Sequence, residues 1–132
     1  MRKNNLIEIR TNMGLFAFDV ITVVGSYDDA LKYTLKKFEI DEDFDNNFGF
    51  EPRGKCFYRI GCVPIVWIPK IPRTPREIAT LSHEALHAVF HLHEWAGIPV
   101  TPETEEMTCH AMAHITNDVL EKLRKKRGTH HE

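Results

Sequence analysis

Apolar and polar residues alternate along the first part of the chain in a pattern that predicts two β-strands. The segments "NLIEIR" (residues 5–10) and "GLFAFDVITVV" (residues 14–24) are rich in aromatic and β-branched side chains. The turn-forming residues Asn12 to Gly14 separate their apolar runs. The pattern therefore predicts a β-hairpin at the start of the chain.

The next segment, "SYDDALKYTLKKFEI", changes to helical spacing. Ser26 can cap a helix, Asp28 and Asp29 fall in its first turn, and apolar residues recur every three or four positions. Residues 41–53 are acidic and contain Asn, Gly and Pro, which predicts a loop.

Residues 55–70, "KCFYRIGCVPIVWIPK", predict a further strand. Pro64 and Pro69 lack the N–H that a sheet ladder needs, so the second half of this strand is predicted to lie at a sheet edge. The chain has three cysteines, and they lack the closely spaced pairs of a zinc knuckle. We therefore expect buried, reduced thiols at Cys56, Cys62 and Cys109.

Two long helices are predicted in the C-terminal half. The first covers "TPREIATLSHEALHAVFHLHEWAG", with Thr74 as cap, Pro75 at the first position, Glu77 completing a capping box and Gly97 at the end. The second begins at "TPETEEM" and runs to the cationic "EKLRKKRG". The order of elements predicts one small α+β domain over residues 1–132.

Composition narrows the possible functions. The net charge of −2 gives no bulk attraction for nucleic acid, and the basic run near the C-terminus is too short to change that expectation. No apolar stretch is long enough to span a bilayer, and no signal-peptide pattern opens the chain. We therefore expect a cytoplasmic protein that binds neither membranes nor nucleic acid.

The strongest chemical signal is the pattern H-E-x-x-H at His83, Glu84 and His87, in the middle of the first long helix. Residues four apart lie one turn apart, with Cβ atoms about 5–6 Å from each other, so the two imidazoles can bind one Zn²⁺ ion. Glu84 lies about 100° round the helix from His83, where its carboxylate can take a proton from a metal-bound water. The alternative is a solvated helix face that carries two histidines. His91 and His93 are expected at the surface, outside the site.

A catalytic zinc site needs a third protein ligand and an open position. If the second long helix folds back antiparallel, Glu106 lies at the margin of its buried side, at helical spacing with Cys109 and Ala113. Glu105 points about 100° away from it and is the second candidate. Acidic residues in a first turn can also simply complement the helix dipole. His110, one turn after Glu106, either contacts the oxyanion or braces the carboxylate, or has no chemical role.

The segments "LSHEALHAVFHLHEWAGI" and "TEEMTCHAMAHITNDVL" resemble the minigluzincins, small zinc metallopeptidase-like proteins of the ImmA/IrrE type, and also small phage-encoded H-E-x-x-H proteins. In the minigluzincins a second helix carries the Glu ligand within E-x-x-C/A-N/H, and Glu106, Cys109 and His110 match that motif. The resemblance covers the C-terminal half and favours Glu106 over Glu105. His110 stands where Asn is usual, and no helix-turn-helix domain accompanies the motif.

The resemblance implies a small zincin-like fold, a short, three-stranded and mostly antiparallel sheet over the active-site helix, whose edge strand holds an extended peptide. It places this edge near Val63–Ile68. The predicted function is a peptidase with Zn²⁺ held by His83, His87 and Glu106 and with Glu84 as base, assisted by His110. The alternative is a zinc-binding interaction module with little or no turnover, such as a phage factor that binds a host protein in the host cytoplasm.

Overall fold

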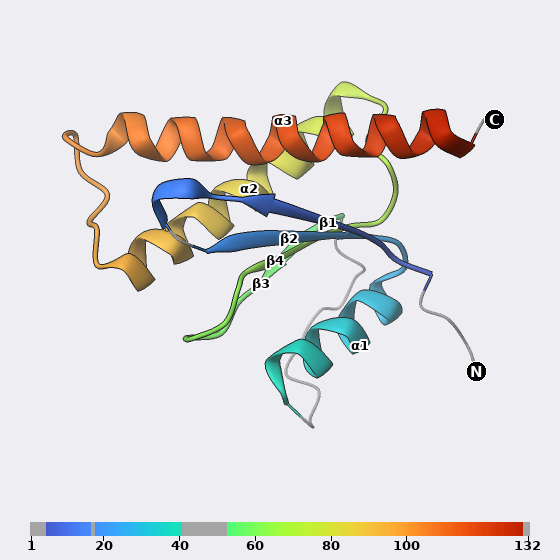
Figure 1. The fold of residues 1–132 in the computed structure, drawn as a ribbon, viewed down its shortest axis with the longest axis horizontal. Coiled ribbons are helices and arrows are strands. Elements are labelled where there is room, and N and C mark those ends of the chain that lie inside the picture. Colours follow the sequence, from blue (N-terminus) through green and yellow to red (C-terminus); the bar gives the residue numbers. More distant parts are fainter. Residues whose placement is uncertain (1–4, 17, 41–52, 131–132) are drawn as a thin grey trace.

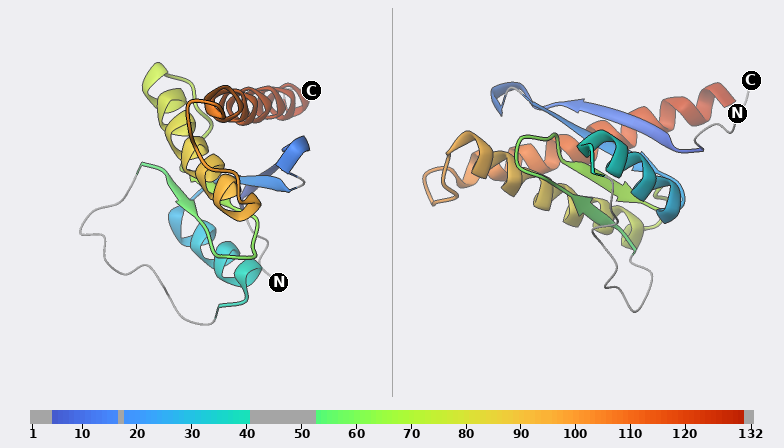
Figure 2. Two further views of the ribbon diagram at one scale, coloured as in Figure 1. Left: turned by 90° about the vertical axis from the view of Figure 1, so that its left-hand side faces the viewer. Right: turned by 90° about the horizontal axis from the view of Figure 1, so that it is seen from below.

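The computed structural model of the protein describes residues 5–16, 18–40 and 53–130. Within them, a four-stranded sheet lies between one α-helix on one face and two on the other (Figures 1 and 2). The strands, in sheet order, are β1 (Ile7–Asn12), β2 (Asp19–Val24), β4 (Ile65–Ile68) and β3 (Lys55–Phe57). The helices are α1 (Tyr27–Phe38), α2 (Pro75–Ala96) and α3 (Glu105–His130).

The sheet is mixed. β1 pairs with β2 and β3 pairs with β4 in antiparallel fashion, whereas β2 and β4 run parallel. The predicted α+β class and the mostly antiparallel sheet are confirmed, whereas the three strands that the resemblance implied were wrong, because the segment 55–70 forms two strands and the sheet has four. α1 covers one face of the sheet, and α2 and α3 cover the opposite face, so three layers enclose two apolar cores (Figure 2). No described helix combines the length and the apolar composition that crossing a membrane requires.

The predicted N-terminal hairpin is confirmed, with a longer connection than the turn residues suggested. The side-chain oxygen of Asn12 accepts a hydrogen bond from the backbone N–H of Gly14 at 2.8 Å, and Gly14 takes the positive φ of 58°. A short 3₁₀ helix, Gly14–Phe16, follows and carries the chain toward β2.

The segment 55–70 forms a hairpin of two strands, and the prediction of one continuous strand was wrong. Gly61 adopts a φ of 85°, and the N–H of Cys62 bonds to the carbonyl of Arg59 at 2.9 Å, which reverses the chain between β3 and β4. Pro64 and Pro69 flank β4 and remove no donor from it.

β4 is therefore a central strand, buried at all four positions and paired on both sides. The prediction of a sheet edge near Val63–Ile68 was wrong. The strand at that end of the sheet is β3, and its position against α2 defines the surroundings of the candidate site.

The start and stop signals of α2 are confirmed. The Thr74 hydroxyl accepts from the N–H of Glu77 at 3.2 Å, the Glu77 carboxylate accepts from the N–H of Thr74 at 3.1 Å, and Pro75 occupies the first turn. Gly97 ends the helix in the left-handed conformation. α3 starts at Glu105, a turn later than the Thr-Pro pair indicated.

Two side-chain contacts fix how α2 and α3 lie against each other. The hydroxyls of Ser82 and Thr116 are 3.1 Å apart, and the Nε2 atom of His93 lies 2.9 Å from the hydroxyl of Thr108. Because the residue numbers decrease on α2 as they increase on α3, the two helices are antiparallel, as predicted.

His93 is buried, with 2% of its surface exposed, and the prediction of a surface position was wrong. Its Nδ1 atom lies 3.1 Å from the carbonyl oxygen of Ile98, and its ring meets Phe16 edge-on. A buried imidazole is tolerated because both ring nitrogens have hydrogen-bond partners. His93 therefore joins α2, the connection after it and α3.

We expect His93→Ala to lower the free energy of unfolding by about 2–4 kcal/mol, because it opens a cavity and leaves the Ile98 carbonyl and the Thr108 hydroxyl without their partner. Chemical denaturation followed by circular dichroism measures this change. His110→Ala, at an exposed position on α3, is the control and should change stability by less than about 0.5 kcal/mol. Equal effects of the two substitutions would contradict the structural role of His93.

Candidate metal centre

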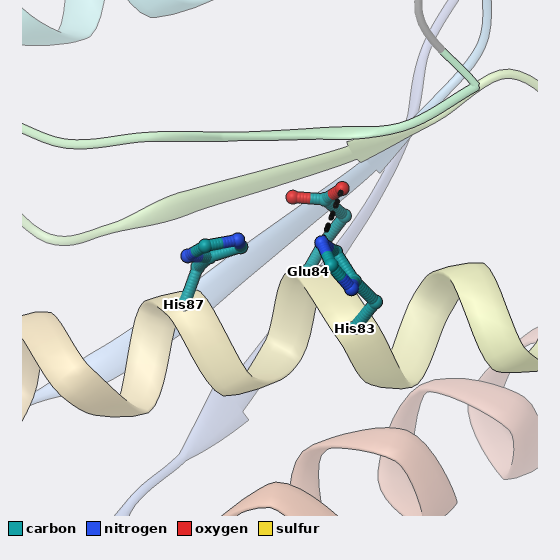
Figure 3. Close-up of side chains that lie close together, drawn as sticks. All are labelled: His83, Glu84 and His87. Carbon is teal, nitrogen blue, oxygen red and sulfur yellow. Dashed lines mark ion pairs between the residues drawn. The ribbon is translucent and has the colours of Figure 1, made fainter.

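The middle of α2 brings together the side chains of the H-E-x-x-H pattern. His83, Glu84 and His87 each offer one ligand atom, and these atoms all lie within 4.8 Å of one another. The two imidazole rings have centroids 5.0 Å apart at an interplanar angle of 72° (Figure 3). The helical spacing thus produces the convergence that the sequence predicted. Among the described residues, no other group of three such side chains converges in this way.

The three side chains differ in their exposure. The imidazoles of His83 and His87 are accessible to solvent, whereas only 13% of the Glu84 side chain is exposed. Figure 3 shows all three side chains on the side of α2 that faces the β3–β4 hairpin, with α3 on the other side. The candidate ligands are therefore open to solvent, and the carboxylate lies deeper, between helix and hairpin.

Burial raises the pKa of the Glu84 carboxyl, and the nearby His83, His87 and Lys55 oppose this shift without cancelling it. The ion pair from Glu84 to the Nε2 atom of His83 spans 4.0 Å. This carboxylate accepts no hydrogen bond from the described residues. A half-buried acid in this situation gains from a cation beside it.

β3 lies so close to α2 that position 54 has no space for a side chain. A Cβ atom on Gly54 would sit 2.8 Å from the Thr80 methyl group and 3.2 Å from Cγ of Glu84. Further along the hairpin, the Tyr58 ring stacks on His91 with centroids 3.4 Å apart. The missing side chain at Gly54 thus permits a close approach at one end of the candidate centre, and the stacked Tyr58 ring contacts α2 at the other end.

Cys56 lies between these two contacts and is partly buried. Burial, reinforced by the charge of Glu84, raises the pKa of this thiol. A protonated thiol is chemically inert, which agrees with the expectation of a structural cysteine. Cys62 is also free and partly buried, whereas Cys109 is free but exposed, so the expectation of burial was wrong for Cys109.

The structure does not bring Glu106 to this centre. Its side chain is 85% exposed and forms an ion pair with His110 at 3.2 Å, whose own side chain is 80% exposed. Glu105, the second candidate, is likewise exposed, in the first turn of α3. Neither carboxylate belongs to the group that converges on α2.

The helix register gives the physical reason. Thr108 lies opposite His93, and Thr116 lies opposite Ser82. In this register, position 106 lies level with the C-terminal end of α2. His83 lies about ten residues before His93 on α2, which corresponds to about 15 Å along the helix axis. Because α2 continues to Ala96 before the chain turns, the start of α3 cannot reach the middle of α2.

The sequence did not point to Gly54 or Lys55 as neighbours of the centre. Both depend on the hairpin folding onto α2, which is a long-range contact that no local pattern encodes. The one available signal was a glycine directly before a strand, which often marks a close approach of the backbone to another element.

Comparison with family models, with curated proteins and with solved structures gives no match for this chain. The resemblance to the minigluzincins therefore stays a prediction, and the geometry of the site alone carries the functional argument.

The raised pKa of Glu84 leads to a prediction for the metal-free protein. The folded state holds the proton more tightly than the unfolded state, so stability falls as pH rises from the ordinary carboxyl pKa through the raised one. Glu84→Gln removes this pH-dependent loss of stability, because a glutamine side chain does not ionise. We expect metal-free Glu84→Gln to be more stable than the wild type at pH 7, with the difference vanishing below pH about 4. Thermal unfolding in the presence of a chelator at several pH values tests this, and a difference independent of pH would contradict it.

Proposed function

We propose that the chain binds Zn²⁺ through His83 and His87 and uses Glu84 as a base in the hydrolysis of peptide bonds. The observation that carries the proposal is the convergence of two accessible imidazoles and one half-buried carboxylate within 4.8 Å on a single helix. A solvated face with two unrelated histidines gives no reason for the carboxylate between them to be desolvated.

The donor set fits zinc. Imidazole nitrogens and a carboxylate oxygen are among the ligands that Zn²⁺ prefers, and two histidines one helical turn apart match its geometry. The desolvated carboxylate supports the same conclusion, because a divalent cation offsets the cost of its burial. When bound, zinc lowers the pKa of a coordinated water to near 7 and polarises a carbonyl.

Glu84 then has the position and the basicity of a proton acceptor. Its raised pKa makes it a better base than an ordinary exposed glutamate. It accepts the proton of the attacking water and delivers it to the departing amine nitrogen. The His83 and His87 side chains are exposed to solvent, and α3 lies on the other side of α2 (Figure 3).

Two substitutions separate metal binding from catalysis. His87→Ala should reduce bound zinc at least tenfold, because one imidazole of the pair is lost. Glu84→Gln should retain zinc and lose at least a hundredfold in hydrolysis, because the base is gone. Zinc is measured by elemental analysis and hydrolysis with fluorescently labelled casein. His114→Ala, at an exposed position on α3, is the control. Retained activity in Glu84→Gln would remove Glu84 from its role.

A second candidate function is a zinc-binding interaction module without turnover, and the position of Glu106 favours it. The described residues supply two imidazoles and Glu84, and no carboxylate from α3 joins them. If Glu84 itself completes the coordination, it is no longer available as a base. In that case the wild type binds zinc and Glu84→Gln binds it more weakly, while neither protein cleaves casein.

Glu106 gives a separate prediction. Because its side chain is exposed and pairs with His110, Glu106→Ala should leave the zinc content and the zinc affinity unchanged within about twofold. Isothermal titration with zinc measures the affinity. A loss comparable to that of His87→Ala would show that α3 shifts along α2 when the metal binds.

A further inference from the structure

We propose that a cationic recess beside the metal centre binds an anionic group of the substrate, and that Arg53 and Arg76 recognise it. This inference rests on the proposed function only for the identity of the bound molecule as a peptide. The recess itself is a feature of the surface between the start of β3 and the first two turns of α2.

Two adjoining depressions make up the recess. One has a volume of about 360 Å³ and reaches His83 and Glu84. The other, of about 420 Å³, extends along the β4 end toward Pro69 and Lys70. Both are lined by Arg53, Arg76 and Thr80, so the two arginines lie where the depressions meet. The recess therefore opens directly onto the candidate metal ligands.

Three cationic side chains line the recess, Arg53, Arg76 and Lys70, against the two carboxylates of Glu77 and Glu84. Lys70 pairs with Glu77 at 3.0 Å, and the Glu77 carboxylate also accepts the backbone N–H groups of Arg73 and Thr74. Glu77 is therefore occupied as a helix cap. Arg53 and Arg76 form no ion pair with any carboxylate of the described residues. A guanidinium without a partner favours a carboxylate, which it can bind through two parallel hydrogen bonds.

The distance from the recess to the metal centre fixes where the anionic group lies on the substrate. Arg76 precedes His83 by seven residues on α2, which corresponds to about 10 Å along the helix. An extended peptide covers about 3.3–3.6 Å per residue. A carboxylate two or three residues from the bond held at the centre therefore reaches the arginines. The first depression is lined by Arg76, Thr80 and His83, so it follows this stretch of α2 from the arginine to the candidate ligands.

Two kinds of peptide supply such a carboxylate: a chain that ends two or three residues after the bond, and a chain with Asp or Glu at that position. We test both with the metal-free wild-type protein, which binds the peptides without consuming them. The probes are acetyl-tetraalanine as the free acid, the same peptide as the C-terminal amide, and acetyl-Ala-Ala-Asp-Ala amide. Binding is followed by amide chemical shifts in ¹H–¹⁵N spectra, at Gly54 and Thr80 in particular.

The two peptides with a carboxylate should bind more tightly than the neutral amide, with an affinity that falls as salt increases. Arg53→Ala and Arg76→Ala should each weaken their binding by about three- to tenfold. Arg73→Ala is the matched control, because it removes the same charge three residues from Arg76 and does not line the recess. Binding of the free acid alone would identify the chain terminus as the ligand, and binding of the Asp peptide alone would identify an acidic side chain.

Equal affinity for the neutral and the charged peptides would overturn the proposal, as would equal losses in Arg73→Ala and Arg76→Ala. None of these measurements involves zinc or peptide cleavage. If the casein assay fails while the carboxylate peptides bind at the recess, the proposed catalysis is wrong and the anion site stands. If casein is cleaved but the protein shows no preference for peptides with a carboxylate, the anion site is wrong and the proposed catalysis stands.

Discussion

The hydrogen bonds of the buried His93 determine how the two long helices are aligned, and the character of the candidate site follows from that alignment. His93 bonds to the Ile98 carbonyl just after α2 and to the Thr108 hydroxyl on α3. The connection between the helices is therefore short and fixed, and α3 starts its return beside the last turns of α2. This register keeps the acids of the first turn of α3 away from the middle of α2.

The consequence is a candidate metal centre that is built from α2 and faces the β3–β4 hairpin. On the α3 side, α2 contributes Ser82 and apolar residues to a closed core. On the hairpin side it presents two accessible imidazoles and a desolvated carboxylate. The two sides of α2 therefore differ: one is packed into the core, and the other holds the candidate ligands. The cationic recess extends the same surface toward the start of α2.

Local signals predicted much of the fold. The cap at Thr74 and the end at Gly97 are determined by residues next to them, and the convergence of His83 and His87 follows from the helical repeat alone. What could not be predicted depends on distant contacts. Pro64 and Pro69 suggested a sheet edge, but they flank a central strand, because the turn at Gly61 brings β3 to the outside. Glu106 has suitable helical spacing, yet its distance from His83 depends on where α2 ends, and the H-E-x-x-H pattern does not encode that length.

The parallel pairing of β2 with β4 has a consequence for how the molecule assembles. During folding, the antiparallel helices α2 and α3 need to close only the short loop that connects them before they can pack together. Ile21 and Ile65, by contrast, must find each other across α1 and the whole segment that follows it, and closing so large a loop is slow. The β3–β4 hairpin, in contrast, is joined to α2 by residues 69–74 alone, so the contact between β3 and α2 does not depend on closing this loop.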